Sequence, residues 1–142
     1  MRENFKIGFF DSGVGGISVM SYAREEIKNA DYIYYADTDH VPYGKKNPEE
    51  VVRYSEEAVE CLVEHGADIV VVACNTATSM AIETLRKTFS VPIIGMEPAV
   101  KPASVKHHGE KILVCATPLT IAGEKLHHLI DENYAGCAYP TL

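Results

Sequence analysis

The chain has 142 residues, which is near the common size of one globular domain. Hydrophobic residues make up 46% of it and charged residues 23%, a composition that can build a core and argues against intrinsic disorder. Thirteen basic and twenty acidic side chains give a formal net charge of −7, which argues against a protein that binds the phosphate backbone of nucleic acids.

The hydropathy pattern predicts neither a membrane span nor a secretion signal. No apolar run reaches the roughly 18 residues that a transmembrane helix needs, and the longest, over 68–74, has the length of a strand. Residues 1–6 lead into a short apolar run without the apolar middle and the cleavage site of a signal peptide. We therefore expect a soluble cytoplasmic protein without a membrane partner.

The four cysteines are dispersed, and none forms a CxxC pair: Cys61, Cys74, Cys115 and Cys137. In a cytoplasmic chain this spacing predicts free thiols. A zinc site needs clustered ligands, and the histidine pairs at 107–108 and 127–128 have no cysteine at a suitable spacing. We therefore expect no bound metal.

Strands and helices alternate from the start of the chain. Residues 6–10 form a short apolar run that stops at a turn signal, and apolar residues from Ile17 to about residue 28 recur at helical spacing. Aromatic and branched residues over 32–36 predict a second strand, which a loop over 37–48 follows. Proline at the end of this loop, followed by two glutamates, suits the start of a helix that Gly66 ends.

The later part of the chain continues the same alternation. Residues 68–73 are mostly β-branched, as in a strand buried on both faces of a parallel sheet. The remaining elements are expected as a helix over 75–89, a strand over 91–95, a turn or helix from Glu97, a fifth strand over 111–115 and a helix over about 119–130. This pattern indicates βαβ units, so the predicted fold class is α/β with a parallel sheet.

Polar clusters directly follow the predicted strands, at 11–12, 37–44, 74–76, 97 and 117–120. In open parallel sheets, ligands bind at the carboxyl ends of the strands, where loops and helix N-termini meet. A site built from these turns is therefore expected.

The glycine-rich segment 11–16 invites a comparison with phosphate-binding loops. A dinucleotide fingerprint requires a third glycine at position 18, where this chain has serine, and no Walker Gly-Lys-Ser/Thr sequence exists. A carboxylate at Asp11 would also lie badly beside a pyrophosphate, and Asp11 could simply cap the following helix. Asp37 lies near the spacing of a ribose-binding acid, so a nucleotide-binding α/β domain remains an alternative.

Cys74 is the sharper indication of chemistry. It ends the buried strand and precedes a helix that opens with Asn75 and Thr76. A thiol at a helix N-terminus lies in positive potential, which favours the thiolate, and the free N–H groups there could hold a substrate carboxylate. The thiolate could act as a nucleophile or as a general base, although no histidine lies in a recognisable partner motif. The alternative is a small residue buried at the end of a strand.

Five segments together resemble one family. They are Phe-Asp-Ser-Gly-Val-Gly-Gly at 10–16, Tyr-Ala-Asp at 35–37, Val-Pro-Tyr-Gly at 41–44, Ala-Cys-Asn-Thr-Ala at 73–77 and Pro-Ile-Ile-Gly at 92–95. In this order the segments resemble the cofactor-independent glutamate racemases of the aspartate/glutamate racemase family. The resemblance runs from about residue 7 to residue 100 and continues more weakly to the end.

The resemblance implies a fold, a reaction and site residues. The fold is a first α/β domain over 1–98, carrying the Cys74 site, followed by the beginning of a second similar domain over 99–142. The reaction interconverts L- and D-glutamate through two cysteines, one on each face of the α-carbon, and supplies D-glutamate for peptidoglycan. It uses no metal, nucleotide or pyridoxal phosphate; the partner is glutamate, and a homo-oligomer is possible. By resemblance, Cys74 carries the proton, Asp11 assists it, and the substrate-binding residues are Ser12, Tyr43, Gly44, Asn75, Thr76, Thr117 and Thr120.

The chain departs from the family in length. Family members are nearly twice as long, and their later half supplies the second cysteine in a Cys-Thr-His context. Cys137 lacks the Thr-His pair and is interpreted as structural. We therefore expect the chain to lack the second catalytic half, to fail to racemise glutamate by itself, and to expose an apolar surface that promotes self-association. A catalytically inactive amino-acid-binding remnant is the alternative from another functional class.

Overall fold

The computed structural model describes residues 5–106 and 110–133. Its first part is a four-stranded parallel sheet in the order β2-β1-β3-β4. The elements of this part are β1 (Phe5–Asp11), α1 (Ile17–Glu26), β2 (Ala30–Ala36), η1 (Tyr43–Lys45), α2 (Pro48–Glu64), β3 (Ile69–Val72), α3 (Asn75–Thr88) and β4 (Ile93–Gly95). The predicted α/β class is confirmed.

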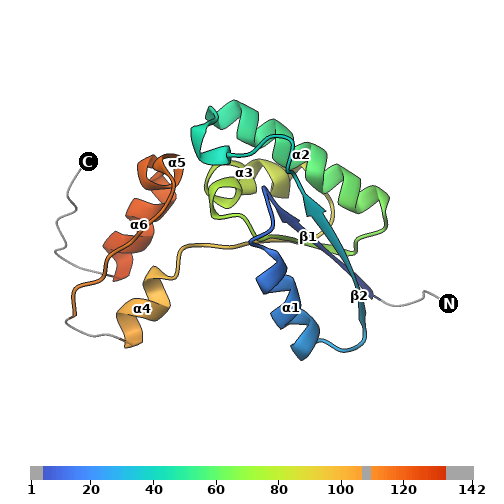
Figure 1. The fold of residues 1–142 in the computed structure, drawn as a ribbon, viewed down its shortest axis with the longest axis horizontal. Helices are drawn as coiled ribbons and strands as arrows, with labels where there is room; N and C mark the ends of the chain where they lie inside the picture. The colour runs from blue at the N-terminus through green and yellow to red at the C-terminus, as the bar shows by residue number, and fades with distance from the viewer. Residues whose placement is uncertain (1–4, 107–109, 134–142) are drawn as a thin grey trace.

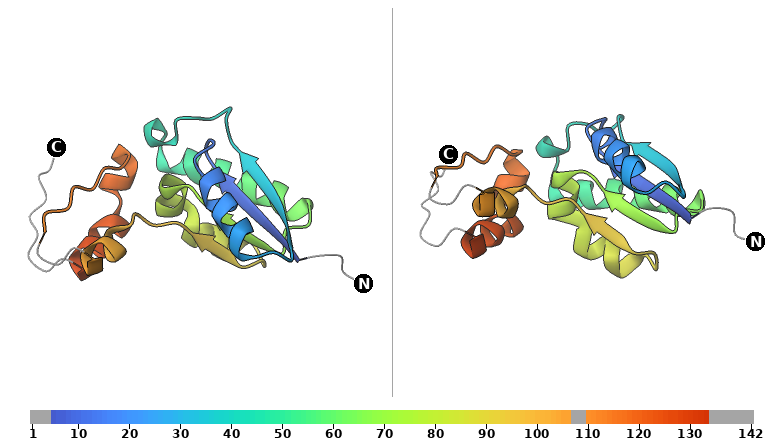
Figure 2. Two further views of the ribbon diagram at one scale, coloured as in Figure 1. Left: turned by 60° about the horizontal axis from the view of Figure 1, so that its bottom comes forward. Right: turned by 90° about the horizontal axis from the view of Figure 1, so that it is seen from below.

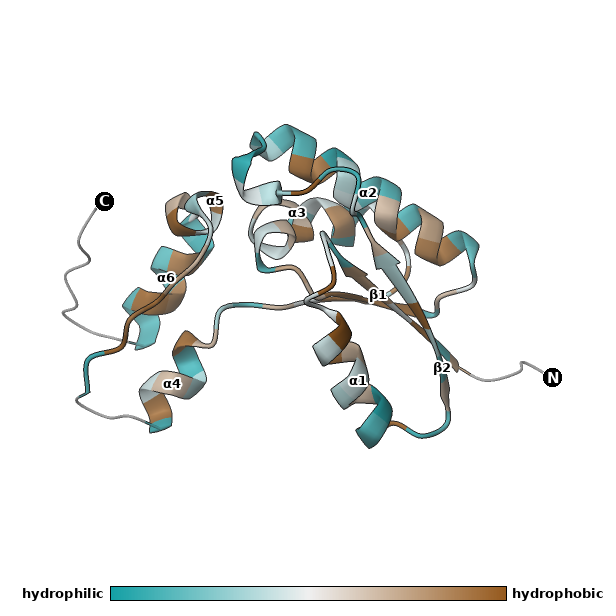
Figure 3. Ribbon diagram, in the orientation of Figure 1, coloured by the Kyte–Doolittle hydropathy of each residue, from teal (hydrophilic) through white to brown (hydrophobic). Residues whose placement is uncertain are grey.

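Helices cover the two faces of the sheet (Figures 1 and 2). Helices α2 and α3 enclose the main core on one face, where Phe10, Val70 and Val72 are fully buried. Gly8 permits the close approach of α2, because a Cβ there would lie 3.1–3.3 Å from Ala67 and Leu62. Helix α1 lies on the opposite face and buries no residue of its own. In Figure 3, β1 is strongly hydrophobic, whereas α2 alternates between hydrophilic and hydrophobic stretches, as expected for an amphipathic helix.

The residues at the two ends of helix α2 favour the start and the end of a helix. Asn47 accepts a hydrogen bond from the Glu50 backbone at 2.8 Å, and the Glu50 carboxylate accepts one from the Asn47 backbone at 3.1 Å. This capping box, with Pro48 in the first turn, satisfies N–H groups that would otherwise lack partners. Beyond the helix, Gly66 adopts a φ of +85°, a conformation that favours glycine.

Three further helices follow β4, and we call them the distal helices: α4 (Val100–Lys106), α5 (Pro118–Ala122) and α6 (Glu124–Asn133). They gather beyond the sheet, and an extended stretch after β4 connects them to it (Figure 1). Their apolar side chains form a separate small cluster of Val100, Leu126 and Ile130. This separation supports the division of the chain after residue 98, which remains a prediction.

The predicted fifth strand is wrong: residues 111–115 belong to neither a strand nor a helix. A strand requires hydrogen-bonded neighbours, and the described part of the sheet ends at β4 without pairing with this segment. Its side chains alternate between half-buried and exposed: Leu113 is 87% exposed, whereas Val114 packs on the small distal cluster. The alternation in this segment therefore reflects the packing of Val114 on α4 and α6 and does not indicate strand pairing.

Over 5–106 and 110–133, none of the helices combines the length and the hydropathy required to cross a membrane.

Candidate active site

The carboxyl ends of β1 and β3 bring Asp11, Ser12 and Cys74 to the same edge of the sheet. The two strands are paired in register up to Phe10 and Val72. The Ala73 backbone then donates a hydrogen bond to the Phe10 carbonyl at 2.7 Å, which keeps the chains together one residue further. The parallel arrangement therefore places both strand-end turns side by side, as the sequence predicted.

Cys74 is the N-cap residue of α3 and is only 6% exposed. Its Sγ accepts a hydrogen bond from the Ala77 backbone at 3.4 Å, and the thiol donates to the Ser12 hydroxyl at 3.5 Å. The backbone donor and the positive end of the α3 dipole both favour negative charge on the sulfur. This environment suits a thiol that gives up and recovers a proton.

Asp11 is also buried, and its Oδ2 accepts a hydrogen bond from the Gly16 backbone at 3.1 Å. Gly16 packs closely on the strand ends, since a Cβ there would lie 2.8 Å from Ala73 and 2.9 Å from the Cβ of Asp11. The glycine loop thus folds around the Asp11 carboxylate. A phosphate would meet this negative charge at the very place where a phosphate-binding loop offers backbone donors.

The charges of both candidate catalytic groups affect the pKa of Tyr34. Its hydroxyl donates a hydrogen bond to the Gly13 carbonyl at 3.0 Å. Burial, and next the negative charge of Asp11, raise the pKa of Tyr34 to about 12, and Cys74 adds a smaller contribution. Asp11 and Cys74 therefore share one electrostatic environment.

Three threonine hydroxyls form a cluster between α3 and α5. The Oγ1 of Thr76 lies 3.0 Å from that of Thr117 and 3.4 Å from that of Thr120, and the latter two lie 3.0 Å apart. Thr76 and Thr120 are buried, whereas Thr117 is exposed and caps α5 by accepting from the Thr120 backbone. The cluster joins the first turn of α3, next to Cys74, to the distal helices.

Gly44 and Tyr43 are two further predicted residues, in the turn before α2. Gly44 lies against Thr117, so that a Cβ there would be 2.7 Å from the threonine Cβ. Tyr43 is 2% exposed, and its hydroxyl donates to the Asp37 carboxylate. Burial and this hydrogen bond raise the pKa of Tyr43. The Tyr43 hydroxyl is therefore occupied, which leaves the main chain of this turn as the part that can face a ligand.

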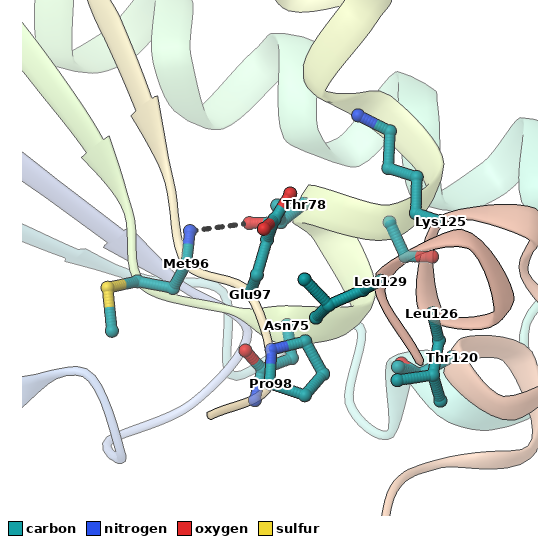
Figure 4. A pocket seen from close by; sticks show the side chains of 10 residues that line it. Asn75, Thr78, Met96, Glu97, Pro98, Thr120, Lys125, Leu126 and Leu129 are labelled. Carbon is teal, nitrogen blue, oxygen red and sulfur yellow. Dashed lines mark hydrogen bonds between the residues drawn. The ribbon is translucent and has the colours of Figure 1, made fainter. Parts of the chain in front are cut away.

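Asn75 is exposed at the N-terminus of α3 and lines a small pocket with residues of α3, α6 and the stretch after β4 (Figure 4). Thr120 lines the same pocket from α5. In Figure 4, Glu97 and Pro98 lie on the side of Asn75, and Lys125 comes from the distal helices. The pocket is thus bounded by both parts of the chain.

All nine predicted site residues lie in the described part of the chain. Among the described residues, no group of His, Cys, Asp and Glu is arranged to hold a metal ion. The histidines at 107–108 and Cys137 lie outside the described residues. The sequence interpretation missed how Asp37 is used, because its spacing suggested a ribose-binding acid, and it missed Tyr34. For Asp37, the available signal was the Pro-Tyr-Gly turn at 42–44, whose tyrosine lies six residues further along the chain.

Comparisons with known proteins agree with one another. The family model described as Asp/Glu/Hydantoin racemase matches residues 18–139. A glutamate racemase of Halothermothrix orenii is 56% identical over 127 residues, which cover 89% of this chain and 50% of that protein. Glutamate racemase 2 of Bacillus subtilis is 51% identical and covers 89% and 49%, respectively. The chain therefore spans about half the length of these curated relatives.

Solved structures give the same result. The glutamate racemase of Aquifex pyrophilus superposes with a TM-score of 0.86 at 42% identity, covering 92% of this chain and 52% of that one. The Escherichia coli glutamate racemase, solved with L-glutamate and the activator UDP-MurNAc-ala, superposes with a TM-score of 0.82 at 32% identity, covering 95% and 51%.

Proposed function

This chain belongs to the Asp/Glu/Hydantoin racemase family, and on that premise we propose that it carries one catalytic face of a glutamate racemase. The observation that carries the proposal is the placement of Cys74: a buried thiol at the N-terminus of α3 that donates to the Ser12 hydroxyl, at the edge of the sheet where β1 ends at Asp11. The whole protein then interconverts L- and D-glutamate without a cofactor, in the cytoplasm, to supply D-glutamate for peptidoglycan.

The reaction requires a base on one face of the α-carbon and an acid on the other. The Cys74 thiolate takes the α-proton and becomes a thiol, while the electron pair left on the substrate spreads into its carboxylate. Asp11 assists this proton transfer from its buried position at the end of β1. A second acid must then deliver a proton to the opposite face.

The described cysteines supply only the first of these groups. Cys61 lies near the end of α2, where its sulfur is 3.7 Å from the His65 Nδ1, and Cys115 is exposed in the segment before α5. Neither has a hydrogen bond to Asp11, Ser12 or Cys74 among the contacts of the described residues. We therefore assign one half-reaction to the part of the chain described, namely removal and return of a proton on the same face.

The substrate carboxylate finds its donors around the same helix end. The first backbone N–H groups of α3, at Asn75 and Thr76, have no partner within the helix, and Ser12 adds a hydroxyl. On the other side, Gly44 and Thr117 hold the main chain of the 43–44 turn close to the threonine cluster. Donors placed here stabilise negative charge as it grows in the transition state.

Two other functions were considered. A nucleotide-binding domain would need Asp37 to bind a ribose. Both carboxylate oxygens of Asp37 are instead bonded within the protein, to His40 and Tyr43. An amino-acid-binding remnant without catalysis would use the same residues as the racemase and differs only in the reactivity of Cys74. The two remaining possibilities therefore require an experiment on the α-proton.

Deuterium exchange at the α-carbon provides that experiment. The 142-residue chain is incubated in D2O with L-glutamate and, separately, with D-glutamate, and the α-proton is followed by NMR. We expect exchange of one enantiomer without inversion, because the protonated Cys74 thiol exchanges with solvent and returns deuterium to the same face. Binding of glutamate without exchange would instead identify a binding module, and stabilisation by NAD or ATP would identify a nucleotide domain.

We also infer that the chain self-associates through the sheet face beside α1. Ile93 is buried toward α3, so its neighbour Ile94 points to the opposite face, where it is 48% exposed next to its strand partner Val71. Ile17 of α1 adds a further exposed apolar side chain, at 43%. Light scattering should give a mass above that of the monomer, and Ile94→Lys should lower it. A monomer at all concentrations would contradict this inference.

A further inference from the structure

We propose that Asp37 is a positioning residue of this site: its buried carboxylate fixes the Tyr43–Gly44 turn against Thr117, and thereby the main-chain groups that face the substrate. The proposal rests on the function proposed above, and it assigns to Asp37 a role that neither the family resemblance nor the spacing of the sequence indicated. Asp37 acts through the turn and does not touch the reacting atoms.

Asp37 makes polar contacts through its backbone N–H and through both oxygens of its carboxylate. Its backbone N–H donates to the Asp11 carbonyl at 3.0 Å, which ties the loop to the end of β1. Its Oδ1 lies 2.7 Å from the Nδ1 of His40, and its Oδ2 accepts from the Tyr43 hydroxyl at 2.5 Å. The residue is only 4% exposed. A carboxylate buried to this extent requires such donors, so the loop and the carboxylate hold each other in place.

The same loop is fixed a second time on α2. The His40 ring stacks on Tyr54 with centroids 3.8 Å apart and an interplanar angle of 15°. Tyr54 is itself covered by cations, with the Arg53 guanidinium 4.7 Å and the Lys46 ammonium 5.5 Å from its ring centroid. Asp37 thus connects the sheet with a stacked aromatic pair, and His40 and Tyr43 cannot shift independently of it.

The position of Tyr43 determines that of its neighbour Gly44. Gly44 approaches Thr117 so closely that not even a methyl group would fit between them. Thr117 in turn contacts Thr76 at 3.0 Å, two residues after Cys74. A small displacement of the turn is therefore transmitted to the groups proposed to bind the substrate carboxylate, whereas Cys74 and Asp11 keep their own contacts.

This geometry predicts an effect on binding and not on proton transfer. In Asp37→Ala, the glutamate concentration that gives half-maximal deuterium exchange should rise about tenfold, while the maximal rate changes less than about twofold. Asp37→Asn should remain within about threefold of the parent, since its amide oxygen still accepts from Tyr43 and its amide N–H still donates to His40. The matched control is Asp39→Ala, which removes an exposed carboxylate of the same loop and should change neither value.

Other patterns would overturn the proposal. With the rate expressed per folded molecule, a lower maximal rate at an unchanged half-saturating concentration in Asp37→Ala would mean a direct chemical role. Equal losses in Asp37→Asn and Asp37→Ala would exclude positioning through these hydrogen bonds. If Asp37→Ala does not fold, His40→Phe replaces it: the variant keeps the ring stack and removes one of the two side-chain partners, and an unchanged half-saturating concentration would contradict the proposal.

A second measurement separates this inference from the proposed function. NMR of the parent chain should show an NOE between the Gly44 α-protons and the Thr117 methyl group, and the same NOE should appear in Asp37→Asn and disappear in Asp37→Ala. If the parent does not exchange the α-proton, the proposed function fails, yet this comparison still tests the role of Asp37. Retention of the NOE in a folded Asp37→Ala protein would overturn the inference.

Discussion

At the scale of single residues, the site depends on acidic groups that are held near one another away from water. Asp11 and Cys74 both act on Tyr34, whose hydroxyl is bonded to the glycine loop between them. A phenol in such a place keeps its proton, because an additional negative charge would be repelled and poorly solvated. Tyr34 therefore reports on the electrostatics of the site without taking part in the reaction.

The raised pKa of Tyr34 makes stability depend on pH at the alkaline end. The folded value is about 12 and the ordinary value 10.0, so the folded state holds the phenolic proton more tightly than the unfolded state. The resulting stabilisation is complete below pH 10 and is lost as the pH rises from about 10 to 12. Urea denaturation should give a free energy of unfolding that falls over this range, and less steeply in Tyr34→Phe. Identical pH profiles for the two proteins would contradict this assignment.

The sequence predicted the position of a site residue where its neighbours in the chain determine its surroundings. Cys74 at the start of α3 and Asp11 at the end of β1 are consequences of strand and helix boundaries, which hydrophobic patterns reveal. The partners of Asp37 could not be found in this way. The hydrogen bond between Tyr43 and Asp37 depends on how an irregular loop folds back on itself. Such a loop has no periodic pattern of hydrophobic residues from which its contacts could be predicted.

At the scale of elements, η1 and α5 make a close contact between the two parts of the chain. Gly44 and Thr117 meet there with no room for a Cβ, and the threonine hydroxyls connect α5 to α3 beside it. Further along, the Lys125 ammonium of α6 pairs with the Glu83 carboxylate of α3 at 3.0 Å. This surface pair is exposed and contributes little to stability.

A methyl group at Gly44 should disrupt this contact. Gly44→Ala forces Thr117 and the start of α5 to move, at a cost of about 1–3 kcal/mol in the free energy of unfolding. Gly13→Ala is the matched control, because a Cβ there meets nothing within 4 Å, and it should cost less than about 0.5 kcal/mol. Chemical denaturation of both variants measures the difference. Equal effects of the two substitutions would show that the Gly44 contact is not tight in solution.

The elements also mark the limit of prediction from hydrophobic pattern. The four strands of the sheet and helices α1, α2 and α3 were expected close to where they lie, because each combines a clear period with turn or cap signals. Residues 111–115 lack a strand to pair with among the described residues; Val114 packs on the cluster of α4 and α6 instead, while Leu113 is 87% exposed. A hydrophobic pattern alone therefore does not predict strand pairing, which depends on a neighbouring strand elsewhere in the chain.

At the scale of the whole molecule, the described part of the chain consists of a well-packed sheet domain and a smaller group of helices. The main core lies between the sheet and α2 with α3, while the distal helices share an apolar cluster of only three buried side chains. The candidate site lies where these parts meet, so its geometry depends on both. The chain spans about half the length of the relatives that it matches.

The central claim is that the sulfur of Cys74 carries a proton to and from the α-carbon of glutamate. The most direct test compares deuterium incorporation at that carbon by the parent chain, by Cys74→Ala and by Cys61→Ala, a matched loss of a thiol on α2. We expect Cys74→Ala to lower the exchange rate by at least about a hundredfold, as loss of a general base does, and Cys61→Ala to leave it unchanged. Exchange by a folded Cys74→Ala protein at the rate of the parent would contradict the claim.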